Sequence, residues 1–408
     1  MTQTTPHSQP AKSGGLIELF ITLAIQAMAS MAVLSLPVVA PVVGAALGIS
    51  PLFAGLYIGV VYVGAVTGSL AAGAIVQRWG PVRVSQAGLV LGGLGLALCC
   101  TGYLPAMAVG SLLMGLGYGP ITPASSHLLA RSTPAHRMSL IFSIKQTGVP
   151  LGGILAGAIV PGLMLSVGWR WGLGSVAIAC LACAVLAQPL RARLDAEKDA
   201  SSALNLGKLA EPARMVAGHT NLRALAICSF FLSASQLILT TYTVVYLHTE
   251  LGFGLVAAGL ALSVSQLAGV IGRVAWGHIA DSGLGAMRTL TLLTFISVLC
   301  CVGTALLRST TPMAVVLVLL AVYGGTAIGW NGVFLAEVAR QAPTGFASMA
   351  TGGVSAFTFF GVVVGPPVFA VIAGTAGSYR VAYLLLALPL AWCCWRLWRN
   401  YRESTAAT

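Results

Sequence analysis

The sequence predicts an all-α integral membrane protein whose twelve membrane-spanning helices form two six-helix bundles, and three observations support this fold class. The 408-residue chain is 57% hydrophobic and only 7% charged, with a mean hydropathy of +0.92, whereas soluble domains carry about 25% charged residues. The apolar runs are continuous and reach the roughly 20 residues that one helical crossing needs, unlike the alternating strands of a membrane β-barrel. A long polar stretch near the middle divides these runs into two sets of six.

Taken in order, the chain begins with a polar tail at 1–15, which we expect to be retained because the apolar run behind it is too long for a signal peptide. The first bundle occupies 16–190 and the second 222–399, while 191–221 is a cytoplasmic link and 400–408 a cytoplasmic tail. The spans of the first bundle are expected at 16–42, 52–76, 84–104, 106–129, 139–165 and 170–190. Those of the second are expected at 222–248, 254–280, 287–307, 313–338, 347–373 and 379–399.

The net charge of +12 is explained by where the basic residues lie along the chain. With both termini in the cytoplasm, only Arg170, Arg308 and Arg380 would be external, and two further cations would lie within spans. This bias is the positive-inside rule. It predicts a multi-pass protein of a bacterial-type inner membrane with cytoplasmic termini, and it argues against a nucleic-acid-binding surface.

Nothing in the sequence predicts an enzyme. It contains no nucleophile paired with a base, no paired carboxylates and no phosphate-binding loop. All nine cysteines lie in apolar spans, and the CLAC stretch at 180–183 has neither the strand context nor the histidine partner of a redox or metal site. We therefore expect a transporter without cofactor, metal or disulfide framework.

The two halves share motifs, which indicates that both follow one plan. LLARSTP in the first half matches EVARQAP in the second, so that Arg131 corresponds to Arg340. GAIVQRWGPVR, beginning at Gly73, matches GHIADSGLGAMR, beginning at Gly277. Parallel six-helix repeats of this kind place a substrate site at the midplane between the halves.

The loop GAIVQRWGPVR resembles the signature that the major facilitator superfamily of secondary transporters carries between its second and third helices. The matching residues are Gly73, Arg78, Gly80 and Arg83. Gln77 replaces the usual aspartate, which in that superfamily helps to latch the halves on the cytoplasmic side, while the second copy keeps its acid as Asp281. The resemblance covers essentially the whole chain and implies that superfamily's fold and a monomer. The residues expected to take part in gating are this loop with Arg131, Gly148, Pro150, Gly277, Asp281 and Arg340.

Two further stretches resemble branches of the same superfamily. Gly148 and Pro150 resemble the glycine and proline motif of helix 5 in its antiporters, with the proline displaced by one residue. GRVAWGHIAD is similar to helix 8 of monocarboxylate and oxalate/formate carriers, which implies that Arg273 contacts a substrate carboxylate. Glycine pairs at four-residue spacing let helices approach closely, and the resemblance places them on helices between the halves: Gly64 with Gly68, Gly148 with Gly152, and Gly361 with Gly365.

Lys145 and Arg273 are the two cations inside predicted spans, and a charge within the membrane is by default a functional hypothesis. The carboxylates near spans are Glu18, Asp281 and Glu337, all close to cytoplasmic ends and none at mid-depth. Two such cations cost several kcal/mol unless an anion or a water-filled cavity accompanies them, which predicts a transported anion. The alternative is a structural or interfacial cation whose long side chain reaches the membrane surface.

Further polar and aromatic side chains at membrane depth are candidates for substrate binding: Gln26, Tyr118, Gln146, Gln236, Tyr242, Trp330 and Asn331. Most lie on helices that line the cavity in the superfamily that the chain resembles. The amides and Tyr118 would supply hydrogen bonds, and Tyr242 and Trp330 would form walls. For each, the alternative is a contact between helices or an aromatic side chain facing lipid.

Together these observations predict a secondary active transporter that moves a small organic anion, a mono- or dicarboxylate, by alternating access. Protons are the expected coupling ion, in symport, and Lys145 and Arg273 would neutralise the substrate. The alternative is a proton-driven exporter of a drug, siderophore or other amphiphilic metabolite, which the helix 5 motif and the apolar composition favour. A receptor with a transporter-like body is a third interpretation, disfavoured by the short tails and link.

Overall fold

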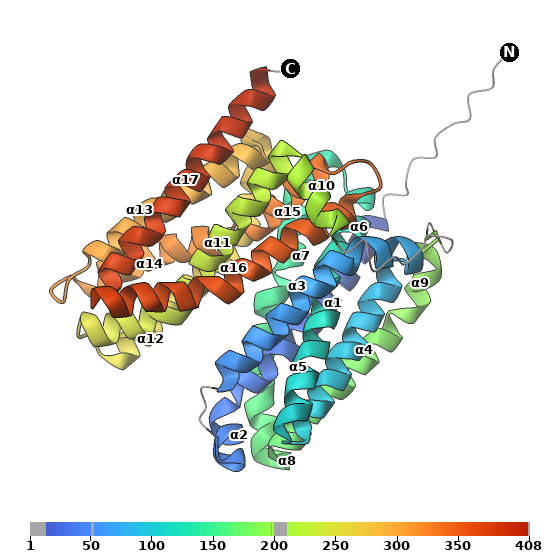
Figure 1. Cartoon of the computed structure of the whole chain (residues 1–408), viewed down its shortest axis with the longest axis horizontal. Helices are drawn as coiled ribbons and strands as arrows, with labels where there is room; N and C mark the ends of the chain where they lie inside the picture. Colours follow the sequence, from blue (N-terminus) through green and yellow to red (C-terminus); the bar gives the residue numbers. More distant parts are fainter. Residues whose placement is uncertain (1–13, 50–52, 197, 200–209, 407–408) are drawn as a thin grey trace.

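The structure, a computed structural model, describes residues 14–49, 53–196, 198–199 and 210–406. Within these ranges the chain forms helices and turns without a strand, which confirms the predicted all-α class. Figure 1 shows the helices gathered in two bundles, one drawn in blue to green and one in yellow-green to red. Most of the predicted tail at 1–15 and the middle of the predicted link at 191–221 lie outside the described residues, so these domain boundaries stay predictions.

The helices follow one another in the order that the apolar runs predict, although several predicted spans are divided into two helices. The first bundle contains α1 (Gly14–Val38), α2 (Ala40–Leu47), α3 (Phe53–Trp79), α4 (Pro81–Cys100), α5 (Leu104–Tyr118), α6 (Ile121–Ser132), α7 (Met138–Gln146), α8 (Gly148–Leu186) and α9 (Gln188–Leu194). The link contributes α10 (Glu211–Gly218). The second bundle contains α11 (Thr220–Val245), α12 (Leu255–Ile279), α13 (Ala286–Leu306), α14 (Met313–Ala327), α15 (Asn331–Gln341), α16 (Ala347–Ala376) and α17 (Tyr379–Ala406).

Among the described residues, eleven stretches are long and apolar enough to cross a membrane, and the longest, Ala135–Leu186, has 52 residues. One crossing needs about 20 residues. Gly168 interrupts this stretch with a φ of 83°, a backbone conformation that favours glycine. One crossing on each side of Gly168, as the sequence predicts, would raise the total to twelve, and that number stays a prediction.

Prolines divide several spans and free backbone carbonyls, which side chains of neighbouring helices then bind. Pro123 in α6 has no N–H for the carbonyl of Gly119, and that oxygen accepts the Ser69 hydroxyl of α3 at 3.0 Å. Pro37 frees the Val33 carbonyl of α1 in the same way for a tyrosine of α3. A proline removes a helix hydrogen bond, and in a membrane interior the freed acceptor needs a partner within the protein.

The glycine pairs pack helices within each bundle, although the spans that carry them meet between the halves as expected, α3 with α16 and α7 with α12. A Cβ at Gly68 would collide with the backbone of α5, and one at Gly148 or Gly152 would collide with α1, which belongs to the same bundle. Gly361 and Gly365 lie equally close to α11. These small residues let neighbouring helices approach to backbone contact, and they stabilise each half separately.

The two halves meet near one end of the molecule, which we call the tail side because α1 starts there and α17 ends there. A Cβ at Gly73 of α3 would lie 2.9 Å from the Cβ of Met349 in α16. Gly277 of α12 and Gly332 of α15 both press against Ser143 of α7. Figure 1 shows α6, α7 and α15 together at this contact, while the opposite ends of the bundles, at α2, α8 and α12, diverge. The halves are therefore closed on the tail side.

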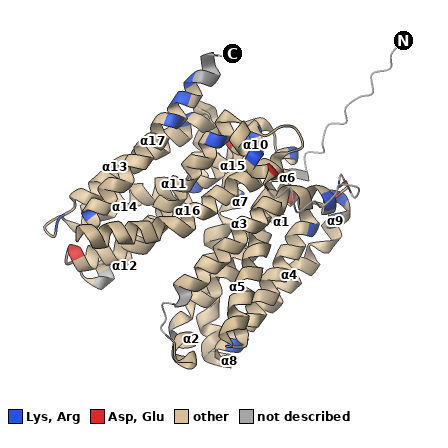
Figure 2. Ribbon diagram, viewed as in Figure 1, with Lys and Arg blue, Asp and Glu red and all other residues tan. Residues whose placement is uncertain are grey.

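Basic residues gather around the tail side, as Figure 2 shows for α9, α10 and the end of α17. Arg380 begins α17 at the other end of the bundle, where its Nε lies 3.6 Å from the Glu250 carboxylate. Glu250 ends the apolar stretch that begins at Thr220. The expectation that carboxylates near spans lie only at tail-side ends is therefore wrong, because Glu250 lies at the opposite end of its span, where it pairs with Arg380.

Candidate functional site

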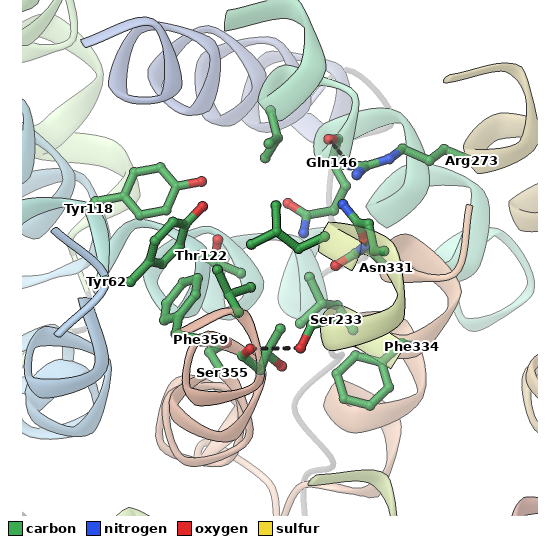
Figure 3. A pocket seen from close by; sticks show the side chains of 16 residues that line it. Tyr62, Tyr118, Thr122, Gln146, Ser233, Arg273, Asn331, Phe334, Ser355 and Phe359 are labelled. Carbon is green, nitrogen blue, oxygen red and sulfur yellow. Dashed lines mark hydrogen bonds between the residues drawn. The ribbon is translucent and has the colours of Figure 1, made fainter. Parts of the chain in front are cut away.

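A cavity lies between the two bundles, within about 740 Å³ of space that is partly open to solvent, and both bundles contribute to its lining. Its polar lining residues are Tyr62, Tyr118, Thr122, Gln146, Ser233, Gln236, Arg273, Asn331, Ser355 and Thr358. Figure 3 shows Tyr62 and Tyr118 on one side, with Arg273 and Asn331 on the other. Among these lining residues, Arg273 is the one with a permanent charge. Five of the predicted substrate contacts thus meet at one cavity: Tyr118, Gln146, Gln236, Arg273 and Asn331.

Arg273 lies on α12 and is only 2% exposed. Its Nη1 donates to the backbone carbonyl of Gln146 at 2.6 Å, which joins the second bundle to the first. Its Nε has no hydrogen-bond partner. Within the described residues no carboxylate lies within ion-pair distance of the guanidinium. A buried donor without a partner is costly, so the guanidinium carries one unsatisfied N–H group beside the cavity.

Pro150 explains why the Gln146 carbonyl can bind Arg273. In an uninterrupted helix the carbonyl of residue 146 accepts the N–H of residue 150, but proline has no N–H. The helical hydrogen-bond pattern is accordingly interrupted between α7 and α8, although Thr147 keeps helical dihedral angles. The freed carbonyl at the cavity wall then accepts the Arg273 guanidinium. Pro150, predicted as a gating residue, thus supplies the acceptor for the predicted anion contact.

Lys145 lies directly beside this link but does not line the cavity. It is 1% exposed, and its Nζ donates to the Gln26 Oε1 at 2.8 Å and to the Gln146 Oε1 at 3.0 Å. Gln146 therefore holds both cations, Lys145 through its side chain and Arg273 through its backbone. The predicted cation pair is brought together, with only Arg273 reaching the cavity.

Gln26 connects Lys145 to the wall of the first bundle. Its Oε1 also accepts the Thr122 hydroxyl at 3.2 Å, and its Nε2 donates to the Tyr118 hydroxyl at 3.4 Å. Gln26 itself is fully buried and lies behind the lining. A chain of hydrogen bonds thus runs from the buried ammonium to two hydroxyls that face the cavity.

In the second bundle, the Gln236 side chain accepts hydrogen bonds from two side chains at the start of α15. Its Oε1 accepts the Trp330 Nε1 at 3.2 Å and the Asn331 Nδ2 at 3.0 Å. Trp330 is fully buried against Phe334 and is not part of the cavity lining. Tyr242 also lies away from the cavity, where it donates to a carbonyl of α16. Trp330 and Tyr242, which were expected to form walls of the cavity, therefore pack behind its lining.

The aromatic wall is formed instead by residues that the sequence interpretation missed. Tyr62 of α3 and Phe359 of α16 lie 5.6 Å apart between ring centroids, and Tyr118 stands edge-on to Tyr62 at 6.5 Å. Ser355 and Phe359 lie four residues apart on α16, so they share one face. The available signal was this run of Ser and aromatic residues inside an otherwise apolar span.

The tail-side contact contains a carboxylate lock. Asp281 follows α12 and accepts the backbone N–H groups of Ser139 and Leu140 at 3.1 and 2.7 Å, across the boundary between the halves. Arg340 of α15 donates to the same carboxylate at 3.1 Å and also to the Ser139 hydroxyl at 3.1 Å. A carboxylate at a helix N-terminus satisfies free N–H groups and the positive end of the helix dipole. The predicted gating residues Asp281 and Arg340 thus meet at the start of α7.

The corresponding loop of the first bundle makes a different contact. Asp195, after α9, accepts the N–H groups of Val82 and Arg83 at 2.8 and 3.0 Å. Burial raises the pKa of this carboxyl, against the lowering effect of those two N–H groups. Gly80 is needed here, because its φ is 88° and a Cβ would overlap the Asp195 carboxylate. This carboxylate holds α4 to α9 within one half, so it does not lock the halves together.

The remaining predicted gating residues lie around the junction of α3 and α4 or at the end of α6. The Gln77 backbone carbonyl accepts the N–H of Asp199, and Arg78 and Arg83 line a surface pocket together with Arg191. Arg131 is exposed at the end of α6, in the place that Arg340 occupies at the end of α15. The repeat in the sequence is therefore visible as an equivalent position in the two halves.

Comparisons with known proteins agree with this architecture. A family model described as Major Facilitator Superfamily matches residues 19–352. The chain is 27% identical over 306 residues to an uncharacterized MFS-type transporter of Mycobacterium tuberculosis, covering 73% of this chain and 67% of that one. It is 24% identical over 328 residues to Monocarboxylate transporter 13 of Rattus norvegicus, covering 78% and 73%. It shares the fold of FucP of E. coli in the outward conformation, with a TM-score of 0.76 and 17% identity over 94% of this chain and 98% of that one.

Proposed function

Because this chain belongs to the Major Facilitator Superfamily and is a transporter, not an enzyme, we propose that it carries a small organic monocarboxylate across the inner membrane. Transport proceeds by alternating access, in symport with protons, and the monomer is the functional unit. The tail side is cytoplasmic, in keeping with the basic residues gathered there. The conformation closed on that side is then the outward-facing one.

The observation that carries this proposal is the Arg273 guanidinium at the cavity. It is buried, it has no acidic partner among the described residues, and its Nε lacks a hydrogen bond. A buried cation without a counterion is costly, and a transported anion offsets that cost. A carboxylate also fits the planar guanidinium, which binds two oxygens at once.

The geometry favours one carboxylate over two. Lys145 is enclosed by two amide oxygens behind the lining, so the cavity presents a single permanent positive charge. The wall opposite, formed by Tyr62, Tyr118 and Phe359, suits an apolar or aromatic body. The likeness to a protein named a monocarboxylate transporter supports the same substrate class.

The link between Arg273 and Gln146 suggests how substrate binding starts the conformational change. The Gln146 carbonyl occupies one donor of the guanidinium and belongs to the other half. A substrate carboxylate competes for that donor and, having a full charge, is the stronger acceptor. Binding would thus weaken a contact between the halves at the base of the cavity, which favours their rearrangement.

Replacing Pro150 by alanine tests this competition. The Pro150→Ala substitution restores a backbone N–H that can bind the Gln146 carbonyl within the helix, so that carbonyl is withdrawn from Arg273. Since a hydrogen bond to a charged group contributes about 1.5–3 kcal/mol, we expect the carboxylate Kd to fall by roughly tenfold or more. The measurement is equilibrium binding of a labelled monocarboxylate to the purified protein.

The matched control for this variant is Pro123→Ala. Pro123 frees the Gly119 carbonyl for Ser69, within the first bundle and without contact to a cation. Its replacement is expected to leave the Kd within about twofold of wild type. Unchanged or weaker carboxylate binding by a folded Pro150→Ala variant would contradict the competition.

Lys145 is the proposed proton carrier. Lysine can release its proton, whereas arginine keeps its charge in proteins. The ammonium is joined through Gln26 to the hydroxyls of Thr122 and Tyr118 at the cavity, which is a route for a proton. Within the described part of the chain, no carboxylate is bonded to it.

Lys145→Met is expected to keep carboxylate binding and to lose the stimulation of uptake by an inward proton gradient. Methionine removes the amine while keeping an unbranched side chain. Lys145→Arg is the matched variant, because it keeps the charge but not the exchangeable proton, and it should lose the stimulation as well. Both variants are compared with wild type in vesicles with and without a pH gradient. Gradient-driven accumulation at the wild-type level in Lys145→Met would show that Lys145 is not the proton carrier.

The proposed function as a whole is tested by uptake of labelled carboxylates into proteoliposomes with an imposed pH gradient. We expect saturable uptake of monocarboxylates that have an apolar body, and much weaker uptake of dicarboxylates of similar size. Outward, proton-driven flux of neutral or cationic compounds, with no carboxylate uptake, would overturn the proposal in favour of an exporter.

A further inference from the structure

A second pocket lies on the outer surface of the second bundle, and it shares no lining residue with the transport cavity. It is an open groove between α13 and α17. From α13 it is lined by Arg288, Leu292 and Phe295, which follow one another at three- to four-residue spacing and so share one helix face. Leu292 is 39% exposed and Phe295 is 49% exposed. The wall is thus an open apolar surface with one arginine at its tail-side end.

The facing wall on α17 is aromatic. Trp395, Trp398 and Tyr401 recur every three residues and line the groove from the other side. Trp395 is 48% exposed and Trp398 is 46% exposed, so neither is used in the core. Tryptophan and tyrosine are typical of the membrane–water boundary, where their rings contact acyl chains and headgroups. This places the tail-side end of the groove at the level of lipid headgroups.

Cations stand over this aromatic wall. The Arg288 guanidinium lies 4.5 Å from the ring centre of Tyr401 and bonds to its hydroxyl. On α17, Arg399 lies 5.7 Å from the ring of Trp395, and Arg402 lies 5.1 Å from the ring of Trp398. Arg288 thus lines the groove, and Arg399 and Arg402 stand over two of its aromatic rings. Positive charge therefore gathers at one end of the groove, and we call this end the rim.

We propose that this groove binds an anionic phospholipid of the tail-side leaflet. Its phosphate lies at the rim, against Arg288, Arg399 and Arg402. One acyl chain lies along Leu292 and Phe295. From Arg288 to Val298 the helix rises about 15 Å, which equals about half of the roughly 30 Å hydrocarbon core. The groove thus matches one leaflet in length and one negatively charged headgroup in charge.

The charge decides between this ligand and ordinary surrounding lipid. Any apolar outer surface of a membrane protein contacts acyl chains, and aromatic side chains at the boundary do so without regard to headgroup charge. Basic pockets between helices on the cytoplasmic side instead select anionic headgroups, with about 1 kcal/mol for each Lys or Arg near the surface. The rim therefore predicts selectivity by charge.

The test is native mass spectrometry of the purified full chain after exchange into equal amounts of phosphatidylglycerol and phosphatidylcholine. We expect retained lipid to favour phosphatidylglycerol by at least about fivefold, and Arg288→Gln to lower this preference by about fivefold. Arg288→Lys should keep the preference, since it keeps the charge. Arg308→Gln, which removes an exposed cation between α13 and α14 at the opposite end, should also keep it.

Three results would overturn the proposal. One is equal retention of the two lipids by wild type, and another is an unaltered preference in Arg288→Gln. The third is displacement of retained lipid by millimolar inorganic phosphate, because it would show that an isolated phosphate ion occupies the rim. Helix content and unfolding temperature equal to wild type show that each variant is folded, so that a lost preference is a property of the rim.

Discussion

Arg273→Gln is expected to reduce monocarboxylate uptake by more than about 100-fold. The guanidinium is the single permanent charge that the cavity lining offers to an anion. Removing one partner of a buried charge pair costs about 3–5 kcal/mol, and each 1.4 kcal/mol is a factor of ten in affinity. Glutamine keeps a hydrogen-bond donor for the Gln146 carbonyl but no charge for the substrate, so the variant separates the two roles.

The measurement is the initial rate of uptake into proteoliposomes, together with equilibrium binding of the same carboxylate. Arg273→Lys is the graded variant, because it keeps the charge but loses the planar pair of donors, and it should fall between wild type and glutamine. Arg308→Gln is the control for loss of one positive charge outside the cavity. Uptake by Arg273→Gln within about twofold of wild type would rule out the guanidinium as the anion contact.

Asp281→Asn is expected to open the tail side. The carboxylate holds two N–H groups of the α7 N-terminus and the Arg340 guanidinium, and it belongs to the other half from α7. Asparagine keeps the shape but loses the charge that favours both partners. Hydrogen bonds to a charged group contribute about 1.5–3 kcal/mol each, so the population open on the tail side should rise by tenfold or more.

The opening can be followed by pulsed spin-label distances between cysteines placed at His136 and Thr344, which are exposed on the two halves at the tail side. In Asp281→Asn we expect a longer distance to become populated. Glu337→Gln is the matched control, because Glu337 also contacts Arg340, at 3.6 Å, but lies in the same half. A distance distribution in Asp281→Asn that coincides with wild type would show that this carboxylate does not hold the halves together.

The spans and their order were predictable because each crossing must be apolar over about 20 residues, which is a local property of the chain. The functional role proposed for Arg273 was also predictable, since a charge inside a span needs a partner and the sequence contains no acid at mid-depth. Asp281 and Arg340 were found through the internal repeat. These signals are hydrophobicity, charge and repeated motifs, which a sequence shows directly.

The lining of the cavity was predicted only in part, for a physical reason. Helices such as α16 are apolar around most of their circumference, so the sequence does not indicate which face is turned to the cavity. Tyr62 and Phe359 were therefore missed, and Trp330 and Tyr242 were expected there although they pack behind it. For the same reason the sequence did not show which neighbouring helix the glycine pairs face, and their close contacts lie within each bundle.

By itself the sequence determined that this protein is helical, spans a membrane and carries two uncompensated cations, because bilayer thickness and the cost of buried charge act on each segment alone. Only the tertiary structure decided that Arg273 faces the cavity while Lys145 is enclosed by Gln26 and Gln146. It also decided that the carbonyl freed by Pro150 meets that arginine. Such choices depend on which helix faces oppose one another, and that is set by packing between segments far apart in the chain.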